Sequence, residues 1–367
     1  MKRVATFVLL LGLLLGTLGS VRATTEYAEP FGAEYTQTVD SAFTFAFVGD
    51  TQIVAHNSPE QMNTIYQWLI DHKDEKNIRF VAGLGDITDK PEDYEWEAAM
   101  AAIQKMDGIL PYSLIRGNHD DMYLYTKYVS YGSYISQLDG MYQDNVFNTY
   151  QTVEIGTLKY LFLCLDHGPT DEALQWACQV VESHPNHNVI VTTHGYINGK
   201  GELLTPETTS IPPSQTNGFN DAPVIWERLV KKYENIIMVV CGHIGTAPEI
   251  VWYEAVGDHG NKIPQVLVNP QRLDKYEGAS GLVALFHFSA DGTQVQVENY
   301  STIRQVHYGP GVTFTVGSAG GNALESPVNW PLIIGGAAGA VAVLAGGIVL
   351  VIWRLRKKAP ATREENG

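Results

Sequence analysis

The sequence predicts an α/β fold in which two packed mixed β-sheets are flanked by helices, followed by one C-terminal transmembrane helix. Short apolar runs rich in β-branched and aromatic residues alternate with helical patterns over the first two thirds of the chain. Four further short strand patterns follow between residues 249 and 300, with Gly-Asp and Asp-Gly turns between them. The segment 331–353 is apolar and carries no charged residue.

Strands and helices alternate in the first part of the chain. Strands are expected at 43–48, 78–84 and 109–115, and helices at 59–72 and 93–106. The first helix carries Ile65, Trp68 and Leu69 at helical spacing. A Tyr-rich segment, 121–148, follows the third strand. We expect it either to line a substrate pocket or to be a packed surface insertion.

The second part continues this alternation. Strands are expected at 149–155, 158–165, 188–193, 235–241, 249–256, 265–268, 282–288 and 294–300, and helices at 170–181 and 221–233. The first two of these strands form a hairpin around Gly156-Thr157. The loop 196–220 is long for a compact domain, and we expect it to form the rim of a site.

The two ends of the chain differ from its body. Residues 1–23 read as a secretory signal peptide and 24–42 as a polar lead-in to a catalytic domain over 43–304. Residues 305–330 are expected to form a stalk, 331–353 a membrane-spanning helix and 354–367 a basic cytoplasmic tail. This predicts a single-pass protein of the cell membrane with its catalytic domain on the extracytoplasmic side.

Charge and cysteine content exclude two classes of protein. The net charge is −16, and the body is more acidic still because both ends of the chain are net basic. A general nucleic-acid binder is therefore not expected, since such binding depends on Lys and Arg neutralising phosphates. The three cysteines are too few for a disulfide scaffold, and we interpret them as small buried thiols. Oligomeric state is left open.

Metal-ligating residue types follow several of the predicted strands. The motifs are Gly49-Asp50-Thr51-Gln52, Gly85-Asp86, Arg116-Gly117-Asn118-His119-Asp120, Thr193-His194-Gly195 and Gly242-His243. Open α/β sheets place their chemistry at the carboxyl ends of strands, so these side chains are expected to converge. Carboxylates, imidazoles and an amide oxygen together are suitable ligands for divalent metal ions.

This ordered set resembles the calcineurin-like metallophosphoesterase superfamily, over about residues 43–302. The resemblance implies an αββα sandwich and hydrolysis of a small phosphate ester by water activated at one or two divalent ions. It implies that Asp86 bridges two metals and that Asn118, His194 and His243 complete the second site. His119 would protonate the leaving oxygen, with its ring oriented by Asp120. Arg116 and His167 are further candidates for contacts with substrate, and Asp89 is a further candidate for the pocket.

The first metal site departs from the family pattern. Asp50 is present, but the expected histidines are replaced by Gln52, a weak amide ligand, and by Gly245. Three alternatives remain open: a weak site filled with the help of substrate phosphate, replacement of the lost histidine by another residue, or a single metal. The replacement candidates are His167, Asp258, His259 and Asn269. Mn²⁺, Mg²⁺ or Ca²⁺ suits the oxygen-rich first site better than Zn²⁺, and iron is a further possibility for the centre.

Two functions are consistent with this pattern. The first is a metal-dependent phosphomonoesterase or phosphodiesterase, which the presence of His119, Asp120, Asp86 and Asp50 favours. The second is a catalytically weak relative that binds a phosphorylated ligand or a surface partner, which the missing histidines favour.

Overall fold

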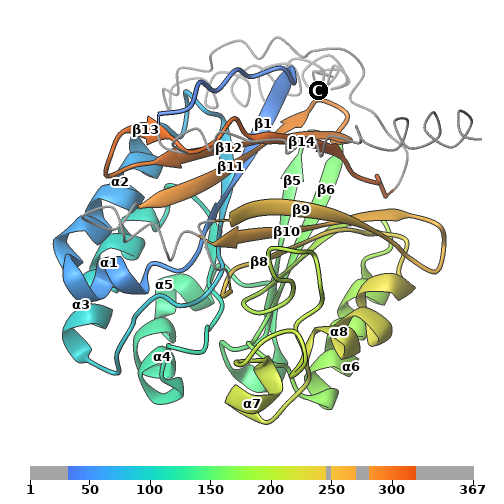
Figure 1. Cartoon of the computed structure of the whole chain (residues 1–367), viewed down its shortest axis with the longest axis horizontal. Coiled ribbons are helices and arrows are strands. Elements are labelled where there is room, and N and C mark those ends of the chain that lie inside the picture. Colours follow the sequence, from blue (N-terminus) through green and yellow to red (C-terminus); the bar gives the residue numbers. More distant parts are fainter. Residues whose placement is uncertain (1–31, 245–248, 270–280, 320–367) are drawn as a thin grey trace, which may run out of the picture. The chain divides into compact units, whose positions relative to one another are not determined.

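Two mixed β-sheets face each other, with helices on their outer sides (Figure 1). The computed structural model describes residues 32–244, 249–269 and 281–319. Sheet 1 has the strand order β13-β12-β11-β1-β2-β3, with β14 beside β12. Its strands are β1 (Ser41–Val48), β2 (Ile78–Gly83), β3 (Tyr112–Ser113), β11 (Leu282–Ser289), β12 (Gln294–Ser301), β13 (Val306–His307) and β14 (Val312–Thr315).

Sheet 2 has the strand order β4-β5-β6-β7-β8-β10-β9. Its strands are β4 (Gly140–Met141), β5 (Thr149–Ile155), β6 (Leu158–Leu165), β7 (Asn188–Thr193), β8 (Ile236–Cys241), β9 (Glu249–Val256) and β10 (Lys262–Asn269). The four strands β6, β7, β8 and β10 are parallel, whereas β5 and β9 join antiparallel. In sheet 1, β1, β2 and β3 are parallel and β11 and β12 antiparallel. Both sheets are therefore mixed, as predicted.

Aromatic side chains fill the space between the sheets. Phe43, Phe45 and Phe47 alternate along β1 and are fully buried on the face toward sheet 2. Phe80 of β2 stacks on Phe162 of β6, with ring centroids 3.9 Å apart. Because neighbouring side chains of a strand point to opposite faces, the residues between these Phe positions face the helices instead. This explains the dense aromatic spacing of the first strand.

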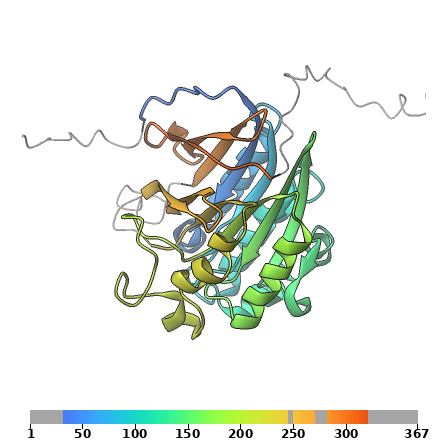
Figure 2. The same cartoon turned by 90° about the vertical axis from the view of Figure 1, so that its right-hand side faces the viewer.

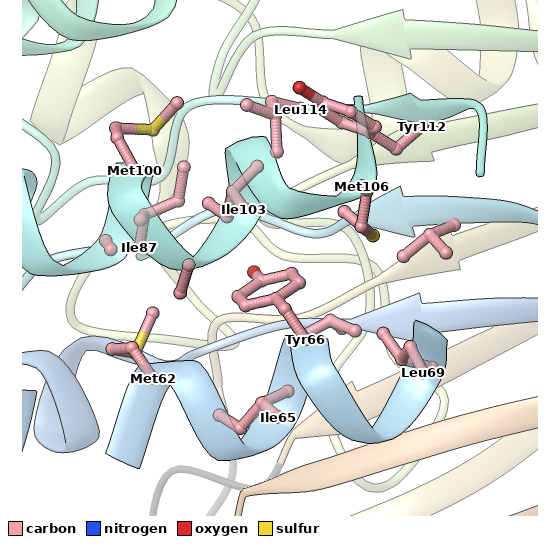
Figure 3. Close-up of a cluster of buried hydrophobic side chains, with 14 of the residues drawn as sticks. Met62, Ile65, Tyr66, Leu69, Ile87, Met100, Ile103, Met106, Tyr112 and Leu114 are labelled. Carbon is pink, nitrogen blue, oxygen red and sulfur yellow. The ribbon is translucent and has the colours of Figure 1, made fainter. Parts of the chain in front are cut away.

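Helices cover the outer face of each sheet (Figure 1 and Figure 2). Those beside sheet 1 are α1 (Gln52–Asn57), α2 (Met62–Asp71), α3 (Asp93–Ile103), α4 (Met122–Val129) and α5 (Gly132–Ile135). Those after β6 are α6 (Asp171–Ser183), α7 (Pro213–Asn217) and α8 (Ala222–Arg228). Met62, Ile65 and Tyr66 of α2 pack into one core with side chains of α3 (Figure 3). The apolar stripe of α2 thus fixes this helix on the sheet.

Several elements differ from the sequence prediction. The helix expected at 59–72 is split into the 3₁₀ turn Pro59–Gln61 and α2, and α1 before it was not predicted. The third strand is reduced to two residues. The Tyr-rich segment packs as an insertion, since Tyr125 and Tyr134 are fully buried. β13 and β14 lie inside the segment predicted to be a stalk, so its first part belongs to sheet 1.

The transmembrane part of the fold prediction needs correction. None of the helices in 32–244, 249–269 and 281–319 is long and apolar enough to cross a membrane. The longest of them, α6, has 13 residues, whereas a span needs about 20. The helix predicted at 331–353 and the single-pass membrane location inferred from it are therefore not supported. That segment, the predicted signal peptide and the predicted tail lie outside the described residues.

Candidate metal centre

Three buried side chains meet beside the carboxyl ends of strands from both sheets. Asp86 follows β2, His194 follows β7 and His243 follows β8. One ligand atom from each lies within 4.8 Å of the other two. Strands of both sheets thus deliver ligands to one place, as the sequence predicts for the carboxyl ends of parallel strands.

The ring of His194 shows how the centre is organised. Its Nδ1 lies 2.7 Å from the carbonyl oxygen of Leu84, so this nitrogen donates the hydrogen bond. Its Nε2 lies 3.2 Å from Oδ1 of Asp86 and 3.1 Å from Oδ1 of Asn118. Two oxygens facing one ring nitrogen require a proton or a metal ion between them. A ligating histidine whose other nitrogen donates to a carbonyl is the usual arrangement in metal sites.

The two ring nitrogens of His243 also have different surroundings. Its Nε2 lies 3.0 Å from the carbonyl oxygen of Ile211, in the long loop, which leaves Nδ1 for a ligand. The predicted second-site set of Asp86, Asn118, His194 and His243 is consistent with these contacts. The loop 196–220 therefore reaches the centre through Ile211, whose side chain is 42% exposed at the rim.

The electrostatics of the pocket favour a cation. Burial alone would raise the pKa of Asp86, but the imidazoles of His194, His119 and His243 together outweigh burial and lower this pKa to about 2. Burial raises the pKa of Asp50 to about 8, and the negative charge of Asp86 adds to the effect. Burial lowers the pKa of His243 to about 4, which keeps this imidazole neutral and able to ligate. Burial would lower the pKa of His194, but Asp86 and Asp50 outweigh burial and raise it to about 9, so a bound metal ion would take the place of the positive charge on this imidazole.

The backbone at the centre is closely packed and strained. Asp50, Asp86 and His243 adopt left-handed conformations, with φ of 52°, 49° and 79°. Such angles are uncommon for residues other than glycine, and cluster at functional sites. A Cβ atom at Gly117 would lie 2.1 Å from Oδ1 of Asp86, so only glycine lets the β3 loop approach this carboxylate.

The orienting contact of His119 differs from the prediction. Oδ1 of Asp89 lies 3.1 Å from Nδ1 of His119, whose side chain is 32% exposed. The carboxylate of Asp120 instead accepts backbone N–H groups of Ile87, Thr88 and Gly117 at 2.9–3.1 Å. Asp120 therefore fixes the two loops around the centre, and Asp89 holds the imidazole. From the sequence, Asp89 was predicted only to lie in the pocket. Its position three residues after Asp86 does not indicate that it contacts His119.

The loop that carries Asp89 is held by a buried carboxylate that the sequence analysis missed. Oε2 of Glu95, at the start of α3, accepts the backbone N–H groups of Asp89 at 2.7 Å and Lys90 at 3.2 Å. Oε1 of Glu95 lies 2.7 Å from Nδ1 of His56, in α1. A fully buried Glu with these partners keeps the His119–Asp89 pair in place.

Arg116 and His167 are both buried. Nε of Arg116 lies 3.0 Å from Oδ1 of Asp166, and its NH2 donates to Oδ2 at 3.0 Å. This pair joins the end of β3 in sheet 1 to the end of β6 in sheet 2. His167 is fully buried beside the rings of His194 and His243. The contact of either residue with substrate remains a prediction.

The residues around the first metal site are also close. Nε2 of Gln52 donates to Oδ2 of Asp86 at 3.0 Å, whereas its buried Oε1 has no hydrogen-bond partner. Both oxygens of Asp50 accept the backbone N–H of His243, at 3.1 and 3.2 Å. Two carboxylates and an unpartnered amide oxygen fit a hard divalent ion.

The other candidates for replacing the lost histidine do not all lie near the centre. Nε2 of His259 lies 3.0 Å from the carbonyl oxygen of Lys232, and Asp258 is exposed, so neither points to the centre. Asn269 is buried at the end of β10, beside β8. Gly245 lies outside the described residues.

The two mixed sheets hold a group of one carboxylate and two imidazoles that could bind a metal ion. The chain belongs to the calcineurin-like phosphoesterase family, whose family model matches residues 43–246. The uncharacterized protein YvnB of Bacillus subtilis is 27% identical over 275 residues, which cover 71% of this chain. The chain spans only 20% of the length of that relative.

Solved structures of low sequence identity resemble the chain. GAP50, described as the anchor in the inner membrane complex of Plasmodium, is 11% identical and superposes with a TM-score of 0.43, covering 75% of this chain and 89% of that one. A conserved uncharacterized protein of Streptococcus pneumoniae, a predicted phosphoesterase, is 13% identical with a TM-score of 0.32, covering 74% of this chain and 97% of that one.

Proposed function

We propose that this chain is a metal-dependent phosphoesterase that hydrolyses a phosphomonoester or phosphodiester. The observation that carries the proposal is the position of His119. This partly exposed imidazole is tied to the buried Asp86–His194–His243 group, because its backbone N–H donates to Oδ1 of Asp86 at 2.9 Å. A group that can deliver a proton therefore lies beside the place where a phosphate would bind.

The side chains divide the chemistry between them. A divalent ion bound at Asp86, Asn118, His194 and His243 supplies Lewis acidity and lowers the pKa of a water molecule. His119 donates a proton to the leaving oxygen, which is general acid catalysis. Asp89 accepts the hydrogen bond from Nδ1 of His119, so the proton to be donated is on Nε2, the nitrogen that faces away from Asp89.

The first metal site determines how many ions take part. Asp50, Asp86 and the unpartnered Oε1 of Gln52 form a set of oxygen ligands. Mg²⁺, Mn²⁺ or Ca²⁺ suits this set, whereas iron or Zn²⁺ suits the imidazole-containing site. One or two ions per chain are consistent with the proposal.

The proposal is tested by hydrolysis of p-nitrophenyl phosphate and bis-p-nitrophenyl phosphate by the full chain. Mn²⁺, Mg²⁺ or Zn²⁺ is added, or a chelator, and Asp86→Asn is the blank. Metal-dependent release that the blank lacks supports a phosphoesterase, and the faster ester indicates the substrate class. Absence of release with every metal, in a chain that still binds metal, supports the second candidate, a protein that binds phosphorylated ligands. The replaced histidine at Gln52 is the observation that keeps this candidate open.

A further inference from the structure

A third imidazole lies against the metal centre. His167 follows β6, two residues after its end, and its side chain is fully buried. Its ring centroid lies 5.2 Å from that of His194 and 5.0 Å from that of His243, and those two are 4.9 Å apart. The three rings thus form a nearly equilateral triangle.

His167 has no hydrogen-bond partner in this environment. Neither Nδ1 nor Nε2 is paired, although both are buried. Burying a polar group without a partner costs on the order of 1–3 kcal/mol, so an apolar ring would be favoured here if packing were the only role. In a neutral imidazole one ring nitrogen has a lone pair to offer, and here no protein group pairs with it. A neutral imidazole in a buried position beside two candidate ligands has the chemistry of a metal ligand.

The triangle has the dimensions of a shared site. Three imidazoles that bind one ion tetrahedrally, each at about 2.1 Å through one nitrogen, hold their ring centres about 5 Å apart. The observed separations of 4.9–5.2 Å agree with this arrangement. The ligand atoms within 4.8 Å of one another come from Asp86, His194 and His243, and the ring of His167 borders this group. No ligand atom of His167 belongs to this group, so the His167 ring must rotate or shift to complete the site.

The packing around His167 keeps its ring close to the centre. A Cβ atom at Gly195 would lie 2.8 Å from Cε1 of His167 and 3.3 Å from Cδ2 of His243. The missing side chain at Gly195 therefore lets the two rings lie next to the β7 backbone. The main chain of His167 is fixed as well, because its N–H donates to Oδ1 of Asp166 at 2.9 Å.

We propose that His167 is an additional ligand of the metal ion held by Asp86, His194 and His243. The centre then offers three imidazoles, a carboxylate and the amide oxygen of Asn118 to a single ion. Such a donor set selects a borderline transition metal such as Zn²⁺, Co²⁺ or Fe²⁺ over Mg²⁺ or Ca²⁺. This imidazole would add a nitrogen ligand to the second site, whereas Gln52 and Gly245 leave the first site without the family's two histidines. The inference rests on the metal centre of the proposed function, but not on hydrolysis.

The test is a titration of the metal-free full chain with Co²⁺, followed by visible absorption, with no substrate present. His167→Ala is expected to weaken Co²⁺ binding by more than about a hundredfold, beyond the tenfold to hundredfold typical of losing a partner outside the coordination sphere. The absorption bands are also expected to change, because the intensity of Co²⁺ bands depends on coordination. His187→Ala is the matched control. This half-buried histidine precedes β7, at the opposite end from His194, and its variant should bind Co²⁺ like the wild type.

A second measurement does not depend on the folding of a variant. Proton NMR of the wild-type chain with one equivalent of Co²⁺ should show paramagnetically shifted signals from three imidazole rings. Signals from two rings only, or a folded His167→Ala variant with wild-type affinity and spectrum, would overturn the inference. His167-dependent Co²⁺ binding without ester hydrolysis would refute the proposed function and leave this inference intact. Hydrolysis with His167-independent Co²⁺ binding would do the reverse.

Discussion

Replacing Arg116 with Met distinguishes a residue that binds phosphate from one that joins the two sheets. The guanidinium makes two contacts of 3.0 Å with Asp166 and is 3% exposed, and Asp166 is 8% exposed. Arg116 follows β3 and Asp166 follows β6, so the pair links the edges of both sheets beside the metal centre. Removing the guanidinium leaves a carboxylate buried without its partner.

The magnitude follows from the burial of Asp166. Burial raises the pKa of this carboxylate from 3.8 to about 6 even though Arg116 acts to lower it. At 1.36 kcal/mol per pKa unit, the charged form already costs about 3 kcal/mol in the folded chain at neutral pH. Breaking a buried ion pair by removing one partner typically costs about 3–5 kcal/mol. We therefore expect Arg116→Met to lower the free energy of unfolding at pH 7 by about that amount.

Urea unfolding at pH 7 measures this effect, together with the KM for an aryl phosphate. The double variant Arg116→Met, Asp166→Asn should be less destabilised than Arg116→Met alone, because it removes the isolated charge. Arg79→Met is the control, since Arg79 is an exposed arginine of the neighbouring strand β2. An unchanged free energy of unfolding with a raised KM would refute the reasoning and assign Arg116 to phosphate binding.

Three further predictions follow from the described contacts. Asp86→Asn should abolish metal binding and hydrolysis by removing a central ligand, and metal retention by dialysed protein would contradict this. His119→Ala should keep the metal but slow turnover by about a hundredfold. The slowing should be larger for phenyl phosphate than for p-nitrophenyl phosphate, and equal slowing would exclude an acid role. Burial alone would raise the pKa of Glu298. Hydrogen bonds from His287 and Lys76, together with their charges, outweigh burial and lower this pKa from 4.5 to about 2. Because the folded pKa is depressed, about 3 kcal/mol of stability is present above pH 4.5 and lost as pH falls toward 2. Urea unfolding across this range should show a shallower slope in Glu298→Gln than in the wild type, and equal slopes would contradict the prediction.

The sequence predicted which strand ends lie together better than it predicted the contacts that support them. Apolar runs followed by Asp50, Asp86, His194 and His243 predicted strand ends, and parallel strands bring such ends together whatever the details of the loops. The pairing of Arg116 with Asp166 could not be predicted in this way, because the partners are 50 residues apart and no local periodicity relates them.

Local patterns also failed where tertiary structure decided the outcome. The polar segment after residue 305 reads as a stalk, yet β13 and β14 gain hydrogen bonds from the edge of sheet 1. The contact of Asp89 with His119 depends on how Glu95 holds the intervening loop, a buried polar interaction that alternation of apolar and polar residues does not encode. The transmembrane prediction rested on an uncharged apolar segment and the basic residues that follow it, and no helix in the described part of the chain supports it.

The left-handed backbone at Asp50, Asp86 and His243 has an evolutionary consequence. Each such conformation costs a residue with a side chain on the order of 1–3 kcal/mol, and glycine would relieve most of it. Selection for a stable fold and selection for ion binding therefore act in opposite directions at the same three positions. A lineage that no longer needed the ion would gain stability by drifting to glycine there. The two aspartates and the histidine at these positions therefore cost the fold stability that a bound ion would offset.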